Sequence, residues 1–310
     1  MREQHLTVSG LSTSTIRHRL HHAGFGVRVG PIGFRIQSNL ASICGGLPAA
    51  YAHFAVIDDD EFADFHVRIR TPSMVRRWIH PQAQFYLGNV APFLPLPIAH
   101  ALPMLEWGLN WCVSTQLHRY LVVHAAAVER DGATYIFPGA PGSGKSTLVA
   151  SLMLSGWRLL TDELVLFDLE NGMIWPFPRP VSLKNESIDV IQTYAPSQQF
   201  GKVVSETSKG TVATLRPDID SVQRQCEPGQ PAGVIFPQFI TEAPPAMERL
   251  PAHETFAALI DQSFNYPTLG ESAFNILADL VSRVPGHAIQ YGNLAEGMEL
   301  VERLHVGESE

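Results

Sequence analysis

The chain has 310 residues, more than one hydrophobic core usually serves, so two domains are expected. With 45% apolar and 17% charged residues, its composition is typical of a soluble globular protein. The formal net charge of −8 argues against a nucleic-acid-binding protein, which normally presents a basic face. It does not argue against a nucleotide ligand, whose phosphates need only a few local donors.

Neither a disulfide framework nor a targeting segment is apparent. Cys44, Cys112 and Cys226 are far apart and match no metal-binding spacing, which predicts free thiols in a reducing cytosol. The N-terminus lacks the apolar run of a secretory signal. The most apolar long stretch, 91–113, is interrupted by prolines and by Glu106, so it predicts no membrane span. A cytoplasmic protein is expected, without membrane or nucleic-acid partners.

The first part of the chain is predicted to be a β-rich N-terminal domain over residues 1–95. Segments 26–38 and 62–70 alternate between apolar and polar residues, as half-buried strands do, and the rest is expected to be short strands and turns. The proline-rich segment 89–97 is the candidate junction. Residues 96–310 are then expected to form the larger domain.

The larger domain is predicted to begin with a helix that buries one face made of Leu105, Leu109, Cys112 and Val113. Two apolar runs then flank "ERDG", a hairpin signal, and the second run leads into a glycine-rich loop. A helix follows and stops at Gly156.

Next come a strand, an Asn-Gly turn and a return strand over 158–177, and later a helical tail with a final strand and helix. Because hairpins lie on both sides of the loop, the expected fold class is α/β with α+β character. Its core would be a mixed or antiparallel sheet, unlike the parallel sheet of ordinary P-loop proteins.

The glycine-rich loop matches G-x-x-x-x-G-K-S, the Walker A pattern of ATP-binding proteins. Its glycines let backbone N–H groups turn toward phosphate oxygens, and the following helix N-terminus adds partial positive charge. Lys145 is expected to reach the β- and γ-phosphates, and Ser146 to bind Mg²⁺. The predicted nucleotide-binding residues are Gly139, Ala140, Pro141, Gly142, Ser143, Gly144, Lys145, Ser146 and Thr147.

An acidic group must help to hold the metal, and the sequence offers two candidates. Asp168 ends an apolar run, as a Walker B aspartate does, but it adjoins turn residues. Asp162 and Glu163 precede that run, and two adjacent carboxylates can divide metal binding and proton abstraction between them. A solvated turn is the alternative for each candidate.

Two further polar residues are candidates for the site. His124 lies in an apolar strand, where a histidine is either a core residue or, at the end of the predicted hairpin, a neighbour of the loop. Arg179 is held between two prolines, near Lys184 and Asn185, and can neutralise charge on a transferred phosphoryl group.

Together these motifs resemble the HPr kinase/phosphorylase superfamily, and most closely its HPr-kinase-related kinase A family. The superfamily shares its nucleotide core with ATP-dependent phosphoenolpyruvate carboxykinase. The resemblance extends from about Leu105 to the C-terminus, with weaker likeness before it. It is carried by the blocks "HAAAVERDG", "PGSGKSTL", "GWRLLTDEL", "RPVSLKN", "TSKGTVATLRP" and "FNYPTLG".

The resemblance implies that His124 is the active-site histidine and that Asp162 and Glu163 are the paired acids that serve catalysis and Mg²⁺. Arg179 is similar to the arginine that follows the second hairpin. Where the classical enzymes have an Arg-Asn pair in a loop that supports phosphorolysis, this chain has His253-Glu254. The resemblance therefore implies little phosphorylase activity. Relatives often assemble, which makes a homo-oligomer an expectation.

The sequence thus predicts an ATP-dependent kinase that phosphorylates a hydroxyl group on a protein or peptide serine or on a small molecule. Lasso-peptide kinases, which are similar in fold, modify a serine in a peptide. The alternatives are a nucleotide-sensing or ATP-hydrolysing regulator and a binding protein with an inactive site. A GTPase is disfavoured because no N-K-x-D motif occurs.

Overall fold

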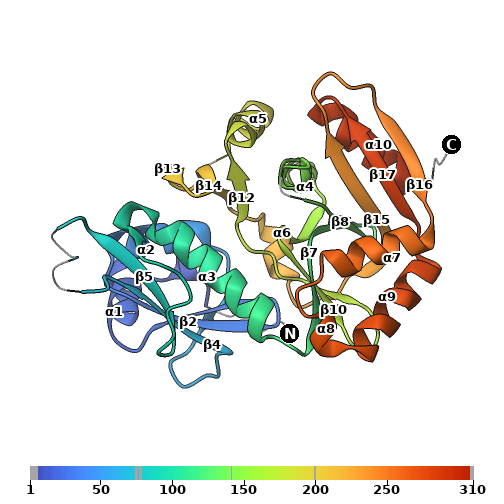
Figure 1. Ribbon diagram of the computed structural model, residues 1–310. Coiled ribbons are helices and arrows are strands. Elements are labelled where there is room, and N and C mark those ends of the chain that lie inside the picture. The colour runs from blue at the N-terminus through green and yellow to red at the C-terminus, as the bar shows by residue number, and fades with distance from the viewer. Residues whose placement is uncertain (1–5, 74–75, 77–78, 141, 199, 308–310) are drawn as a thin grey trace.

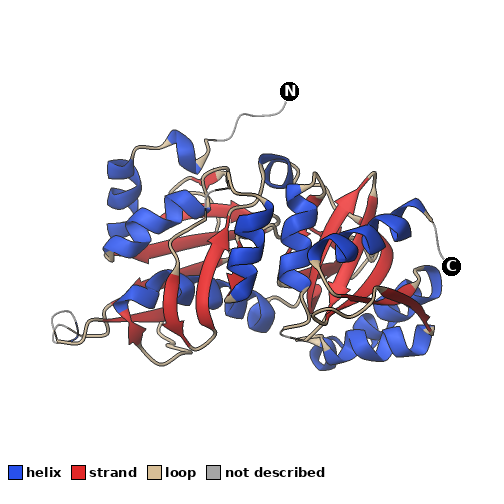
Figure 2. Cartoon of the chain, turned by 90° about the horizontal axis from the view of Figure 1, so that it is seen from above, coloured by secondary structure: helices blue, strands red, loops and turns tan. Residues whose placement is uncertain are grey.

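The computed structural model describes residues 6–73, 76, 79–140, 142–198 and 200–307. Its strands form three sheets, and helices cover the two larger ones (Figures 1 and 2). The protein is therefore mixed α/β, as the sequence predicted. Among the described residues, no helix has both the length and the apolar character needed to cross a membrane.

The first sheet contains six strands in the order β3-β1-β2-β4-β5-β6. The strands are β1 (Phe25–Val29), β2 (Ile32–Ser38), β3 (Val56–Ile57), β4 (Phe65–Arg70), β5 (Gln82–Leu87) and β6 (Leu96–Pro97). The associated helices are η1 (Val8–Gly10), α1 (Thr13–His21), α2 (Ala41–Ala50), η3 (Ile98–His100) and α3 (Ala101–Gln116). The alternating segments 26–38 and 62–70 are thus strands, as expected.

Helices α1 and α2 were not predicted, and the expectation of only strands and turns before residue 95 was wrong in this respect. The Ser12 hydroxyl caps α1 by accepting a hydrogen bond from the Thr15 N–H at 3.1 Å. Helix α2 contains two glycines and Pro48, so its sequence gives little local sign of a helix. Its buried face, which includes Ile43 and Leu47, supplies the tertiary packing that stabilises it.

Helix α3 is the helix predicted after the proline-rich segment, and Leu105, Leu109, Cys112 and Val113 are all buried. It packs against β5 and α2, in the same hydrophobic core as the first sheet. This core also includes Tyr120, Val122 and Leu166 of the strands that follow, so it is continuous with the edge of the second sheet. The domain division at 95/96 stays a prediction.

The second sheet has the order β11-β10-β7-β8-β15-β17-β16, with β9 also paired to β7. Its strands are β7 (Tyr120–Arg130), β8 (Ala133–Pro138), β9 (Arg158–Thr161), β10 (Leu164–Asp168), β11 (Ile174–Trp175), β15 (Gln230–Phe239), β16 (Ala246–Leu250) and β17 (Gly286–Tyr291). Strand β15 is parallel to β8 and β17, and the other pairings are antiparallel. The sheet is therefore mixed, as predicted.

The "ERDG" segment makes the predicted hairpin between β7 and β8. Asp131 and Gly132 have φ of 51° and 82°, the left-handed conformation that a tight hairpin turn requires. Residues of β7 alternate between two cores, because Val123 and Ala125 face one side of the sheet and Ala126 and Val128 the other.

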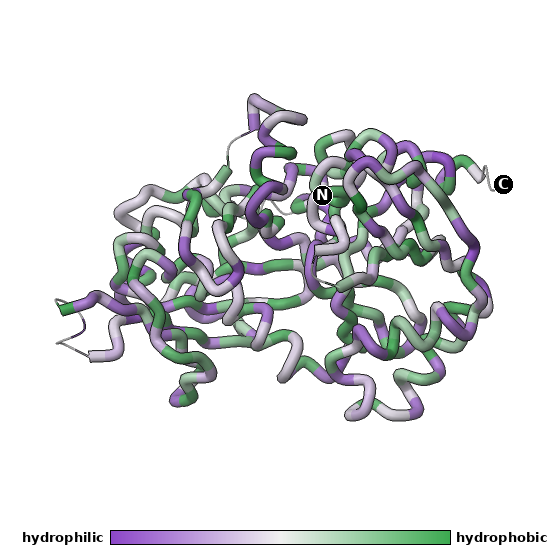
Figure 3. Tube along the Cα trace, turned by 45° about the horizontal axis from the view of Figure 1, so that its top comes forward, coloured by the Kyte–Doolittle hydropathy of each residue, from purple (hydrophilic) through white to green (hydrophobic). Residues whose placement is uncertain are grey.

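Helices cover both faces of this sheet. They are α4 (Lys145–Leu154), α5 (Glu186–Tyr194), α6 (Ile219–Gln223), α7 (Ala252–Asp261), α8 (Tyr266–Leu269), α9 (Glu271–Arg283) and α10 (Leu294–Val306). Residues of α4 and α10 belong to one core, and residues of α7 and α9 to the other. In Figure 3 the helical turns near the C-terminal end alternate between hydrophobic and hydrophilic residues, as expected for helices buried on one side.

A third, small sheet has the order β12-β14-β13, with β12 (Val181–Lys184), β13 (Val204–Thr207) and β14 (Gly210–Leu215). In Figure 1 it lies with α5 between the first sheet and α4. The three cysteines are free, as predicted; Cys44 and Cys112 are buried and Cys226 is exposed.

Candidate functional site

The glycine-rich loop joins the end of β8 at Pro138 to the start of α4 at Lys145. Gly142 and Gly144 both have φ of 91°, a conformation that strongly favours glycine. At Gly144 a Cβ would also lie 2.5 Å from the Tyr291 hydroxyl oxygen. The predicted residue Pro141 lies outside the described residues.

No side chain of a described residue caps the N-terminus of α4, whose N-cap is Gly144. Its first backbone N–H groups therefore need a partner from outside the helix, and an anion is a suitable one. The described part of the loop thus leaves the start of the helix open to a ligand.

Lys145 is a buried cation at the first position of this helix, with 7% of its surface exposed. Its Nζ donates a hydrogen bond to the Gly139 carbonyl oxygen at 3.4 Å. Burial lowers the pKa of Lys145, and the charges of Asp162 and Glu163 act against that shift. The ammonium is thus held in a dehydrated position at the base of the loop.

Asp162 lies in a two-residue break between β9 and β10, both of which pair with β7. The carboxyl is almost fully buried, and its Oδ2 accepts a hydrogen bond from the Ser182 N–H at 3.1 Å. Its Oδ1 is also buried and has no hydrogen-bond partner among the described residues. Burial, and next the adjacent Glu163 carboxylate, raise the pKa of Asp162 to about 6.

Glu163 points to a different set of partners. Its Oε2 lies 3.7 Å from His124 Nε2, and its Oε1 lies 4.0 Å from Lys184 Nζ. Burial acts to raise the pKa of this carboxyl, but His124, Lys184 and Lys209 together hold it well below its usual range. The two adjacent acids therefore differ: Glu163 is ionised and paired, whereas Asp162 has an unpaired buried oxygen.

His124 belongs to the site by its geometry and is not a buried core residue, since 25% of its side chain is exposed. On β7, His124 pairs with Leu164, which is the residue directly after the acid pair. The backbone N–H of His124 donates a hydrogen bond to the Gln262 carbonyl oxygen at 2.7 Å. The Phe264 ring lies against the imidazole, with ring centroids 6.1 Å apart.

Arg179 is placed differently from a free phosphate-binding arginine. It is buried, forms an ion pair with Glu106, and donates a hydrogen bond to Asn110 Oδ1, both on α3. The Tyr51 hydroxyl donates to the same Glu106 at 3.0 Å. The sequence did not reveal this network, because Glu106 lies 73 residues before Arg179 in an otherwise apolar helix.

Asp168 lies at a turn, which was the alternative prediction for this residue. Its Oδ1 accepts a hydrogen bond from the Glu170 N–H at 2.9 Å, and its Oδ2 accepts one from Trp175 Nε1 at 3.0 Å. These hydrogen bonds account for both carboxylate oxygens within the turn between β10 and β11.

The residues present fit a Mg²⁺ ion that binds together with a nucleotide. The Ser146 hydroxyl lies close enough to Asp162 to lower the pKa of that carboxyl, and Asp162 Oδ1 lacks a partner. Over the described residues, no group of three or more His, Cys, Asp or Glu side chains could hold a metal alone. Mg²⁺ usually takes one or two protein oxygens and completes its shell with phosphates and water, which matches this donor set.

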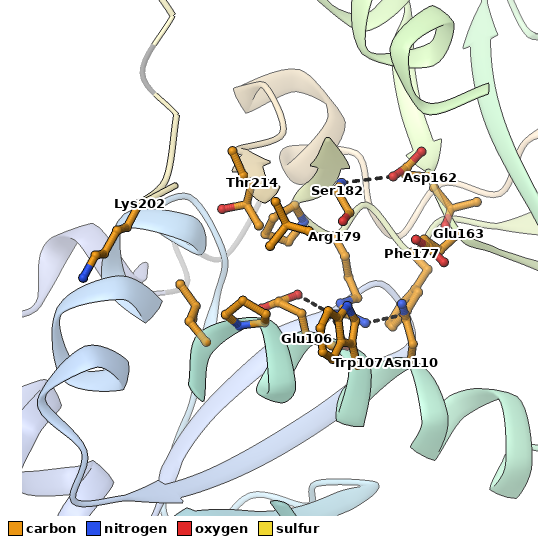
Figure 4. A pocket seen from close by; sticks show the side chains of 16 residues that line it. Glu106, Trp107, Asn110, Asp162, Glu163, Phe177, Arg179, Ser182, Lys202 and Thr214 are labelled. Atoms are coloured by element: carbon orange, nitrogen blue, oxygen red, sulfur yellow. Dashed lines mark hydrogen bonds and ion pairs between the residues drawn. The ribbon is translucent and has the colours of Figure 1, made fainter. Parts of the chain in front are cut away.

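A cleft runs from the acid pair to helix α3, and is called the α3 cleft below (Figure 4). It encloses about 40 Å³, within about 650 Å³ of empty space that includes open solvent. The lining comes from α3, from the acid-pair segment and from the third sheet; it comprises Leu102, Pro103, Glu106, Trp107, Asn110, Thr161, Asp162, Glu163, Phe177, Arg179, Pro180, Ser182, Lys202, Val212, Ala213 and Thr214. Asp162, Glu163 and Arg179, predicted from separate motifs, therefore line one cleft.

Asp162→Asn is expected to stabilise the fold at neutral pH. Because the folded-state pKa is raised to about 6 from 3.8, burying the charged carboxylate lowers stability above pH 6, and this penalty disappears as the pH falls toward 4. The variant should exceed the parent by roughly 2–3 kcal/mol in unfolding free energy at pH 7.5. Urea unfolding at pH 7.5 and pH 4.2 measures this, and an equal or lower stability of the variant at pH 7.5 would contradict it.

Comparison with known proteins gives distant similarity to solved structures alone. No protein-family model and no curated protein matches the chain. Among solved structures, the Hpr(Ser) kinase/phosphatase from Coxiella burnetii matches with 12% identity, covering 60% of this chain and 97% of that chain, at a TM-score of 0.27. A TM-score this low does not establish a shared fold. The specific resemblance to the kinase A family stays a prediction, and the functional argument depends on the site itself.

Proposed function

We propose that the protein is a Mg²⁺- and ATP-dependent kinase that transfers the γ-phosphate to a hydroxyl group. The observation that carries this proposal is the meeting of three separate segments at one place. The buried Lys145 and the adjacent Ser146 begin α4, the acid pair separates β9 from β10, and His124 on β7 lies 3.7 Å from Glu163. A structural ion pair alone would not require an uncapped helix N-terminus and an unpaired buried carboxylate oxygen beside it.

In the proposed complex the loop amides and Lys145 hold the β- and γ-phosphates. Ser146 and Asp162 are the residues that would hold Mg²⁺, since Asp162 Oδ1 has no other partner among the described residues. The metal would supply charge neutralisation at the phosphate oxygens. Its positive charge would also favour the ionised form of Asp162, whose pKa burial raises in the free protein.

The transfer step assigns a different role to Glu163. The acceptor oxygen attacks the γ-phosphorus, the bond to the β–γ bridging oxygen breaks, and its electron pair leaves on ADP. The acceptor proton passes to the Glu163 carboxylate, which lies 3.7 Å from His124. Because its low pKa makes this carboxylate a weak base, the proton moves late, as the bond to the leaving oxygen breaks. Arg179 borders the same cleft, and its Nε has no hydrogen-bond partner among the described residues, so it is proposed to face the reacting phosphate from the cleft side.

The experiment that tests this function incubates the purified protein with γ-labelled ATP, Mg²⁺ and a cell extract separated by size. Label in a protein, peptide or metabolite fraction supports the kinase. Label released only as inorganic phosphate contradicts it and selects an ATP-hydrolysing regulator. The Lys145→Met variant, purified in the same way, controls for contaminating kinases. Equal label incorporation with this variant would mean that another kinase is responsible.

A further inference from the structure

The distribution of lysine along the chain is unusual. Of the 22 basic Lys and Arg residues, only Lys145, Lys184, Lys202 and Lys209 are lysines, and the other 18 are arginines. All four lie at the candidate site or line the α3 cleft. The basic Lys and Arg residues in the rest of the protein are arginines, so the lysines occur in one region of a molecule whose net charge is −8.

Three of these lysines face the acid pair. Lys184 Nζ lies 4.0 Å from Glu163 Oε1, and Lys145 and Lys209 each interact electrostatically with Glu163. Burial lowers the pKa of Lys209, whose Nζ also lies 5.3 Å from the centroid of the Trp107 ring. These three ammonium groups surround the position proposed for the triphosphate, and their charge matches that role.

Lys202 differs from the other three. It lines the α3 cleft but has no ion pair among the described residues, and it lies in the loop just before β13. Figure 4 shows Lys202 at the end of the cleft opposite Asp162 and Glu163, with Thr214 and Glu106 between them and its ammonium group directed away from the acid pair. Because Lys202 is exposed, its side chain is free to turn toward a ligand in the cleft. A free cation therefore lies at one end of the cleft and the acid pair at the other.

The walls between these two ends are largely apolar. Trp107 on α3, Phe177 between β11 and β12, and Val212 on β14 line the cleft. The charges of Glu106 and Arg179 neutralise each other in an ion pair, so they add no net charge to the cleft. The enclosed part of the cleft is small, about 40 Å³, within about 650 Å³ that includes open solvent. Only a slender part of an acceptor can enter it, and the rest of the acceptor would lie in the open mouth.

We propose that the α3 cleft binds the phosphate acceptor, and that the acceptor carries an anionic group that Lys202 recognises. This inference rests on the proposed kinase function. The acceptor hydroxyl lies at the acid pair, an apolar body lies against Trp107, and a carboxylate or phosphate group lies at Lys202. A peptide with an acidic residue near its serine and a small hydroxy acid share this chemistry, and the test below distinguishes these sources.

The first arm of the test is lysine footprinting of the native protein. Acetylation with a water-soluble acylating reagent, read by mass spectrometry, reports each of the four lysines separately. Mg²⁺ with a non-hydrolysable ATP analogue should protect Lys184 and Lys209 and leave Lys202 reactive, whereas Lys145, with 7% of its surface exposed, should be unreactive throughout. Failure to protect both Lys184 and Lys209 would overturn the proposed function and this inference with it, whereas protection of Lys202 by the nucleotide alone would overturn only the inference.

The second arm measures acceptor preference with two defined panels. One contains blocked pentapeptides with a single serine among apolar residues and one Glu, Gln or Lys at each other position in turn. The other contains aliphatic hydroxy compounds that end in a carboxylate, an amide or an amine. In the panel that supplies acceptors, the carboxylate-bearing compounds should be phosphorylated fastest, and the panel that responds identifies the source. Equal rates for Glu-, Gln- and Lys-bearing acceptors would overturn the inference.

Charge reversal at Lys202 separates recognition from a structural effect. Lys202→Glu should lower kcat/KM for the anionic acceptor about tenfold and favour the amine-bearing one, with the KM for ATP unchanged. Lys202 is exposed, so the fold should persist. Arg17→Glu on the exposed side of α1 is the matched charge-reversal control and should leave the preference as in the parent. An unaltered preference in Lys202→Glu would overturn the proposal.

Discussion

Lys145→Met is expected to lower phosphoryl transfer at least about 100-fold, because it removes a dehydrated cation from the position proposed for the β- and γ-phosphates. The fold should survive, since methionine keeps an apolar chain of similar length and removes a charge whose burial is unfavourable. The measurement is the initial rate of label transfer from γ-labelled ATP, together with Tm. A variant with a near-parental rate and Tm would contradict the phosphate-binding role of the loop.

Asp162→Asn and Glu163→Gln are each expected to lower the transfer rate at least about 100-fold, whereas Asp168→Asn should remain within about threefold of the parent. The first two substitutions keep shape and remove the charges proposed to hold Mg²⁺ and accept the proton. Asp168 instead satisfies its turn, through the Glu170 N–H and Trp175 Nε1, and its loss should mainly affect stability.

Rates at saturating ATP and Mg²⁺, measured for all three variants with one acceptor, decide between the two metal-binding arrangements. Titration with Mn²⁺ in the presence of a non-hydrolysable ATP analogue adds a readout that does not depend on turnover, since only Asp162→Asn should greatly weaken metal binding. If Asp168→Asn proves to be the severe variant, the protein is an ordinary Walker B enzyme and the roles proposed for the acid pair are wrong.

The local parts of the fold could be predicted because short-range chemistry determines them. The Asp131-Gly132 turn, the helix at Leu105–Val113 and the end of α4 before Gly156 each depend on residues adjacent in sequence. Gly156 has φ of 93°, as expected for a glycine just after a helix end. The mixed character of the second sheet followed from the same reasoning, since two hairpins around one loop require antiparallel strands.

Long-range contacts were not predictable from these patterns. Strand β15 lies between β8 and β17 with parallel pairing, although it is about 90 residues from the former. The break between β9 and β10 that exposes Asp162 and Glu163 to the site was also hidden, because the sequence is consistent with one continuous strand. The partners of Arg179 lie on α3, and nothing near Arg179 in sequence indicates them.

Within the site, the sequence indicated residue types but not their orientations. It placed Asp162 and Glu163 together as interchangeable acids. Their different surroundings come from the Ser182 N–H on one side and from His124 and Lys184 on the other. Arg179, expected as a free cation near the phosphate, is instead tied to Glu106, so its proposed part in transfer depends on its position in the cleft.

The central claim is that the loop before α4 binds a triphosphate and that Ser146 and Asp162 bind the accompanying metal. A crystal structure of the protein with Mg²⁺ and a non-hydrolysable ATP analogue tests it most directly. The expected result is β- and γ-phosphate oxygens on the backbone N–H groups of the loop and on Lys145 Nζ, with Mg²⁺ coordinated by Ser146 Oγ and Asp162 Oδ1. Nucleotide bound elsewhere, or Mg²⁺ coordinated by Asp168 with Asp162 uninvolved, would contradict it.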